Sequence, residues 1–175
     1  MIDSATGQRI VVKQHSVYGS YIHVLSDEDS YALEDLFDDE WYVPYWPGNP
    51  LVPGEHGGNE FYFGSAVCAE KLQVILDSSG ATIPRDVAAE VATDSESGTR
   101  VLVRIDKMYG PYFEVPFSAE PLWLEEILQG RFYLPYWVSK RIVDGVSVAL
   151  AYHFGLAADS RKLQGMLDEI DFGNR

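Results

Sequence analysis

The sequence predicts an α+β protein made of two tandem copies of one β-β-α-β-β-α unit, packed with pseudo-two-fold symmetry. The first observation is an internal repeat: residues 3–77 align with residues 94–168 without a gap, and 25 of the 75 aligned pairs are identical. The second is that both copies show the same succession of strand-like and helix-like hydrophobic patterns. We therefore divide the chain into an acidic copy one (residues 1–77), a spacer (78–93) and copy two (94–175).

The spacer begins with turn-forming residues, and a short helix is expected after Pro84. A unit of this length is close to the lower limit for burying a hydrophobic core alone. We therefore expect the two copies to pack against each other. Two units that fold independently on a spacer are the alternative, and they would unfold separately.

Each copy is expected to begin with a β-hairpin. Residues 10–17 and 101–108 are rich in β-branched side chains, and residues 20–25 and 111–116 alternate between apolar and polar positions. Gly19 and its counterpart Gly110 stand between these strands, where a hairpin turn requires a positive φ. The hairpin is followed in both copies by a helix, because apolar residues recur with helical spacing in "EDSYALEDLF" and "EPLWLEEIL".

The repeated motif "YVPYW" (42–46) and "YLPYW" (133–137) follows this helix. A proline within it predicts a short strand at the edge of a sheet or at a bend. Another strand is expected in "NEFYFG" (59–64) and in "VSVALAYHFG" (146–155), and then a second helix with a stripe that includes Leu72 or Leu163. The pattern of each copy is thus β-β-α-β-β-α.

The two copies differ in net charge. The whole chain has 27 acidic and 13 basic residues and a net charge of −14, which disfavours direct binding to nucleic acid or to anionic membranes. Over the aligned residues, copy one has 13 acidic and 3 basic side chains, whereas copy two has 10 and 8. The excess of negative charge therefore lies in copy one.

Most of this excess surrounds the first helix of copy one. The carboxylates that we assign to partner binding are Asp27, Glu28, Asp29, Glu34, Asp35, Asp38, Asp39 and Glu40. The last three lie at the carboxyl end of the helix, where negative charge is unfavourable, and copy two has Gln129, Gly130 and Arg131 there. We therefore interpret the cluster as a surface that binds a basic protein partner, with a solvated helix face as the alternative.

If the basic partner is a protein that holds DNA or RNA, the carboxylates can imitate a row of phosphates. The sequence thus favours a non-enzymatic inhibitor or neutralising factor of a nuclease or another nucleic-acid-binding protein. Immunity proteins and anti-defence proteins fit this description by charge and size. The oligomeric state is left open.

Small-molecule binding is the alternative function. Aromatic residues make up 13% of the chain, and a duplicated fold often leaves a cleft between its copies. The residues expected to line such a cleft are Tyr45, Trp46, Tyr136 and Trp137. Packing in the core is the competing interpretation of these rings.

No motif indicates a catalytic residue, a metal site or a cofactor. The four histidines are scattered, and only the loop "GEHGGNE", with Glu55, His56 and Glu60, resembles a ligand set. There is no nucleophile elbow and no phosphate-binding loop. The single cysteine, Cys68, excludes an internal disulfide and fits a reducing compartment. No signal peptide and no membrane-length apolar run are expected, so we predict a cytoplasmic protein. Because no catalytic motif is found, we also predict that the protein is not an enzyme.

Overall fold

A computed structural model describes residues 1–48, 59–78, 101–117 and 122–170. Copy one contains β1 (Lys13–His15), β2 (Gly19–Val24), α1 (Asp27–Asp35), the π-helical turn η1 (Leu36–Glu40), β3 (Trp46–Pro47), β4 (Asn59–Gly64) and α2 (Ala69–Asp77). Copy two contains β5 (Arg104–Asp106), β6 (Gly110–Pro116), α3 (Leu122–Gly130), β7 (Trp137–Val143), β8 (Val146–His153) and α4 (Ser160–Asp168). The predicted α+β duplication is confirmed. The expected spacer helix after Pro84 lies outside the described residues.

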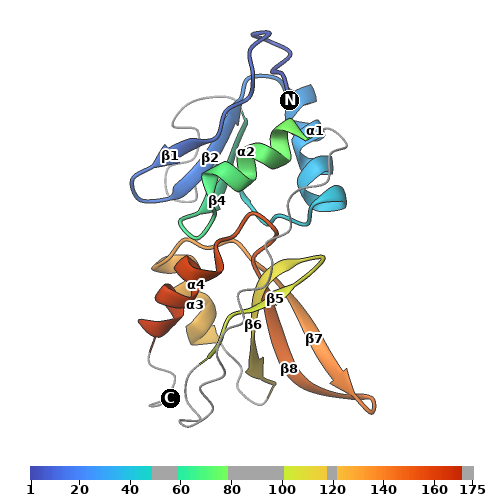
Figure 1. Cartoon of the computed structure of the whole chain (residues 1–175), viewed down its shortest axis with the longest axis vertical. Coiled ribbons are helices and arrows are strands. Elements are labelled where there is room, and N and C mark those ends of the chain that lie inside the picture. Colours follow the sequence, from blue (N-terminus) through green and yellow to red (C-terminus); the bar gives the residue numbers. More distant parts are fainter. Residues whose placement is uncertain (49–58, 79–100, 118–121, 171–175) are drawn as a thin grey trace.

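The two copies build matching antiparallel sheets, with strand orders β1-β2-β4-β3 and β5-β6-β8-β7. Figure 1 shows the copies stacked along the long axis of the molecule, with β7 and β8 projecting from copy two. Strands β3 and β7 are edge strands, as the motif prolines predict. The strands begin only at Trp46 and Trp137, so the proline precedes each strand instead of interrupting it. In the described part of the chain, no helix is long and apolar enough to cross a membrane.

The hairpin glycines have a different role from the expected one. Gly19 has the predicted positive φ of 76°, but it is the first residue of β2 and lies outside the turn. A Cβ on Gly19 would lie 2.3 Å from the carbonyl carbon of Gly64. The turn itself is held by His15 Nδ1, which accepts hydrogen bonds from the backbone N–H groups of Val17 and Tyr18, both at 3.1 Å. Asp106 caps the corresponding turn of copy two, which explains why this histidine has no counterpart.

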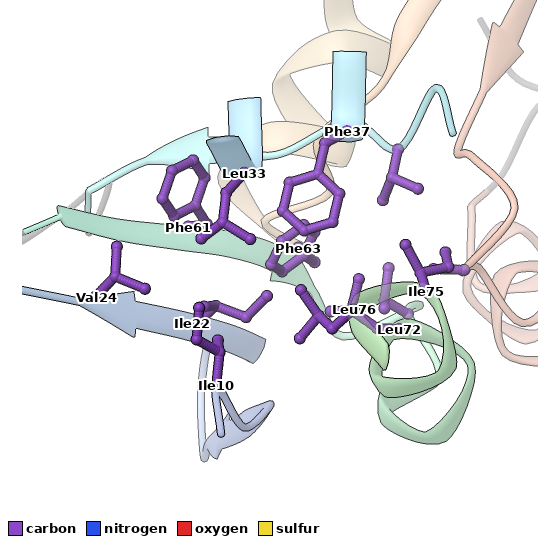
Figure 2. Packing of buried hydrophobic residues seen from close by; sticks show 13 residues of the cluster. Ile10, Ile22, Val24, Leu33, Phe37, Phe61, Phe63, Leu72, Ile75 and Leu76 are labelled. Carbon is purple, nitrogen blue, oxygen red and sulfur yellow. The ribbon is translucent and has the colours of Figure 1, made fainter. Parts of the chain in front are cut away.

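Each copy has its own hydrophobic core. In copy one, side chains from β2, β4, α1, η1 and α2 meet on one face of the sheet, among them Ile22, Phe63, Leu33, Phe37 and Leu72, as Figure 2 shows. Each of these five is at most 1% exposed. Both helices of the copy therefore cover the same face of the sheet.

Each of the two cores contains one alanine that belongs to the other copy. Ala157 of copy two is buried in the core of copy one, and Ala66 of copy one is buried in the core of copy two. Both residues lie just before the second helix of their copy, on the segment that crosses the junction. Neither core is therefore closed by residues of its own copy alone.

The pseudo-two-fold axis passes between these segments. Val67 forms an isolated antiparallel bridge with Ala158, its own counterpart in the repeat. On either side, the N–H of Cys68 donates to the carbonyl of Ala157 (2.9 Å) and the N–H of Asp159 donates to the carbonyl of Ala66 (2.8 Å). A residue can face its own counterpart in this way only on a two-fold axis.

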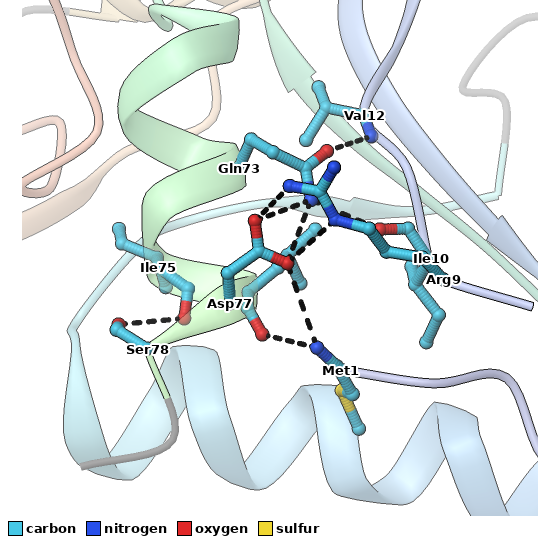
Figure 3. A network of polar contacts seen from close by, with 9 residues as sticks. Met1, Arg9, Ile10, Val12, Gln73, Ile75, Asp77 and Ser78 are labelled. Carbon is cyan, nitrogen blue, oxygen red and sulfur yellow. Dashed lines mark hydrogen bonds and ion pairs between the residues drawn. The ribbon is translucent and has the colours of Figure 1, made fainter. Parts of the chain in front are cut away.

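The residues repeated near the end of each copy hold the second helix to the segment that precedes the first strand. The side chain of Gln73 accepts a hydrogen bond from Val12 N–H (2.9 Å) and donates one to the carbonyl of Ile10 (3.1 Å). Asp77 forms an ion pair with Arg9 and lies 3.8 Å from the amino group of Met1 (Figure 3). Copy two repeats the clamp with Gln164, which engages Val103 and Val101. These repeated polar residues thus serve the fold.

Candidate functional site

The repeated motif forms the junction between the copies. The ring of Tyr42 packs edge-on against Tyr109 of copy two at 5.2 Å, and the ring of Tyr133 packs edge-on against Tyr18 of copy one at 5.0 Å. Both motif tyrosines have positive φ, 51° and 52°, which is unusual for a bulky residue. The first tyrosine of the motif is thus held in a strained conformation where it contacts the other copy.

An open groove of about 770 Å³ lies at this junction. We call it the junction groove. Its lining residues come from both copies: Glu34, Phe37, Asp38, Tyr42, Val43, Pro44, Tyr45, Pro47, Tyr109 and Trp137. The groove is therefore mostly aromatic and apolar, with two carboxylates and no basic side chain among the described residues that line it.

Two of the four predicted cleft residues line the junction groove, namely Tyr45 and Trp137. Trp46 and Tyr136 are not among its lining residues. Tyr136 packs instead against Tyr152 in the core of copy two, with the ring centroids 5.2 Å apart. The contributions of Tyr42 and Tyr109 were not predicted, although both residues are repeated in the sequence.

The predicted acidic residues lie along α1 and η1. Asp27, Glu28, Asp35, Asp38, Asp39 and Glu40 are exposed and Glu34 is half-buried; these seven residues are called the acidic surface below. Neither α1 nor η1 has a basic residue in its last turn. No side chain of the acidic surface forms an ion pair with another described residue. Its negative charge therefore faces solvent without a counter-charge from the described chain.

Asp29 differs from the other seven carboxylates because it is only 6% exposed. Its Oδ2 accepts hydrogen bonds from Ser4 N–H, Ser4 Oγ and Ser26 Oγ, each at 2.8 Å. Burial alone would raise the pKa of Asp29, but these hydrogen bonds hold the pKa below its usual value. Asp29 thus ties the N-terminal segment to the start of α1, and we leave it out of the acidic surface.

The junction groove and the acidic surface share Glu34 and Asp38. Tyr45 donates a hydrogen bond from its hydroxyl to Asp38 Oδ2 at 3.2 Å. Burial, and then the negative charges of Asp38 and Glu34, raise the pKa of Tyr45 far above its ordinary value. The tyrosine therefore remains a protonated donor beside two carboxylates.

The same positions in copy two are arranged differently. Glu125, the counterpart of Glu34, accepts a hydrogen bond at 3.2 Å from the hydroxyl of Tyr152. Copy one has Phe61 at the position of Tyr152, so Glu34 lacks this donor. Gln129 replaces Asp38 and donates to the hydroxyl of Tyr136 at 2.8 Å. These positions therefore hold two carboxylates in copy one, but in copy two only one carboxylate, which has a hydroxyl donor.

On the outer face of the copy-two sheet, His153 lies between two aromatic rings. It stacks on Trp137 at 3.8 Å and on Tyr112 at 5.3 Å, and its Nε2 is 2.9 Å from Ser139 Oγ. Desolvation lowers the pKa of His153 despite the opposing charges of Asp106 and Glu114. The folded protein thus favours the neutral ring, and the unfolded chain binds the proton more readily.

We expect this histidine to make the protein less stable as the pH falls. The free energy of unfolding should decrease below about pH 6.5, with a slope of at most about 1.4 kcal/mol per pH unit from this group. His153→Tyr, which introduces the residue found at the matching position 62, should flatten the curve between about pH 5 and 7. Urea unfolding of both proteins across this range measures the effect. An unchanged slope would mean that another group dominates.

The described residues offer little for metal or nucleophilic chemistry. No group of three His, Cys, Asp or Glu side chains in this part of the chain could hold a metal ion. Glu60 is buried on β4, whereas Glu55 and His56 lie outside the described residues. Cys68 is half-buried before α2, and its Sγ donates to Glu70 Oε2 at 3.0 Å.

No protein-family model, curated protein or solved structure matches the chain.

Proposed function

We propose that this chain is a non-enzymatic interaction protein, an inhibitor or neutralising factor whose acidic surface binds a basic surface of another protein. The expected partner is a nuclease or another protein that holds nucleic acid, and the mechanism is charge mimicry. Immunity proteins and anti-defence proteins are classes of inhibitor that fit this description by charge and size. Such a function requires occupation of a basic groove and no reaction.

The observation that carries this proposal is the difference between two copies of one fold. Asp38, Asp39 and Glu40 lie on η1 at the carboxyl end of α1, where the helix dipole makes negative charge unfavourable. In copy two, Arg131 stands in place of Glu40 and pairs with Glu169 at 2.6 Å. Since the fold tolerates neutral or basic residues at these positions, the carboxylates of copy one are not needed for folding.

Neutralising part of the acidic surface is expected to weaken partner capture. Asp35→Asn, Asp39→Asn and Glu40→Gln together leave the lining of the junction groove unchanged. The loss of three facing charges should weaken binding by about tenfold or more, and capture by the unchanged protein should fall as salt rises. The measurement is a pull-down at two salt concentrations, followed by identification of the captured protein and a titration with it.

The matched control removes three exposed carboxylates from copy two: Glu126→Gln, Asp144→Asn and Glu169→Gln. This variant has the same net charge as the first and should capture the partner normally. Equal losses of partner binding in both variants would mean that binding depends on net charge alone and not on the acidic surface. A captured partner without a basic surface would contradict the mimicry mechanism.

The junction groove favours a second candidate function, binding of a small molecule. Its volume and its aromatic lining, drawn from both copies, resemble the general features of ligand pockets. In that case Trp137→Ala should abolish ligand binding, and binding should depend little on salt. Salt dependence therefore distinguishes the two functions.

A further inference from the structure

The junction groove has an unmatched negative charge. Glu34 is half-buried in its lining and forms no hydrogen bond or ion pair with another described residue. Asp38 accepts one hydrogen bond, from Tyr45, and its carboxylate is otherwise exposed. Two carboxylates on adjacent turns of one helical segment thus face a groove to which the described residues contribute no cation.

The rest of the groove consists largely of aromatic rings. Tyr109 stands edge-on to Tyr42 and to Trp137, with both pairs of centroids 5.2 Å apart. The Trp137 ring also stacks on His153 at 3.8 Å, and Tyr45 packs on Phe61 at 5.1 Å. These rings are held in place before any ligand arrives.

Rings and carboxylates in one groove match the chemistry of a guanidinium group. Arginine presents a planar cation that stacks on aromatic faces and donates several hydrogen bonds to carboxylates. Lysine supplies a point charge without a plane, and a neutral ligand would leave both carboxylates unmatched. The charge and the shape of the side chains thus favour arginine.

The equivalent residues of copy two indicate that this property is specific to copy one. There the hydroxyl of Tyr152 donates a hydrogen bond to Glu125, and Gln129 replaces the second carboxylate. The frame formed by the motif and the helix is the same, yet copy one has two carboxylates there, of which Glu34 has no described donor, whereas copy two has one carboxylate, which accepts from a tyrosine. A purely architectural role of the groove would not require this difference.

We propose that the junction groove binds an arginine side chain of the basic partner, with Glu34 and Asp38 as acceptors and Tyr42, Tyr45, Tyr109 and Trp137 as the aromatic walls. The inference rests on the proposed function, since it assigns one contact within that interface. The acidic surface supplies long-range attraction, and the groove selects arginine over lysine at short range.

The test uses an acetylated, amidated tetra-arginine peptide, with tetra-lysine and tetra-citrulline peptides as comparisons. The indole N–H signal of Trp137, assigned with Trp137→Phe, is followed by NMR in the full chain at physiological salt. We expect the arginine peptide to shift this signal saturably, the lysine peptide to bind more weakly, and the citrulline peptide to have no effect. Glu34→Gln with Asp38→Asn should weaken arginine binding about tenfold, because charge-assisted hydrogen bonds are lost.

Asp35→Asn with Asp39→Asn is the matched control, because it removes the same charge from the same segment outside the groove. This control should change the affinity no more than about twofold, as expected for screened charges at a distance. Equal weakening by the two double variants, or no shift of Trp137 with tetra-arginine, would overturn the groove proposal. Neither outcome affects the proposed function, which is tested by partner capture with the Asp35, Asp39 and Glu40 variant.

Discussion

Replacing Gly155 with alanine should destabilise the protein by about 3 kcal/mol or more. Gly155 has a φ of 78°, and a Cβ there would lie 2.7 Å from Pro44 Cδ, 2.8 Å from the Tyr42 carbonyl oxygen and 2.9 Å from Val43 Cα. These atoms belong to the repeated motif of the other copy. Since a proline ring and a backbone carbonyl cannot rotate away, the two copies would have to separate locally.

Gly145 provides a matched control for this substitution. Its φ is 79°, and a Cβ there would have no neighbour within 4 Å. Gly145→Ala should therefore cost only the strain of the left-handed backbone, about 1 to 2 kcal/mol. Urea unfolding of both variants separates backbone strain from contact between the copies. Equal losses of stability would contradict the close packing at this junction.

Truncating Phe37 to alanine should cost about 3 to 5 kcal/mol, because the side chain is fully buried. Its ring packs on Phe63 at 5.0 Å and on Tyr45 at 6.0 Å, so the substitution leaves a cavity between η1 and the sheet. The loss of stability should extend to copy two, because Ala157 of copy two is buried in the same core. Hydrogen exchange in β6 and β8 should therefore accelerate together with exchange in β2 and β4.

Tyr31→Ala is the control for this experiment, since Tyr31 is 65% exposed on α1, the helix that η1 continues. It should change the stability by no more than about 0.5 kcal/mol. If Phe37→Ala accelerated exchange only in copy one, the copies would be independent folding units. Common acceleration would support a single cooperative unit.

Much of the fold could be predicted from the sequence because it was duplicated. Leu33 and Leu124 remain apolar in both copies while their exposed neighbours change, which identifies the buried face of each helix. Proline in the motif indicated an edge strand, and β3 and β7 are edge strands. These features depend on residues close together in the chain, for which periodicity is a direct signal.

Less of the candidate functional site could be predicted from the sequence. The charge difference identified the acidic residues, yet Asp29 looks like its neighbours and is buried under Ser4 and Ser26. Tyr42 and Tyr109 meet across the junction although they are far apart in the sequence. A pattern within one copy cannot show which of its faces meets the other copy.

The sequence by itself determined that there are two copies, the order of their elements and the concentration of charge in copy one, because these properties depend on local composition and period. The tertiary structure alone decided that Ala66 and Ala157 are exchanged between the cores. It also placed Glu34 of α1 and Asp38 of η1 in one groove with the copy-two ring of Trp137. Both results follow from the pseudo-two-fold packing of one copy on the other. The contacts across this junction join residues of different copies, which no pattern within one copy can reveal.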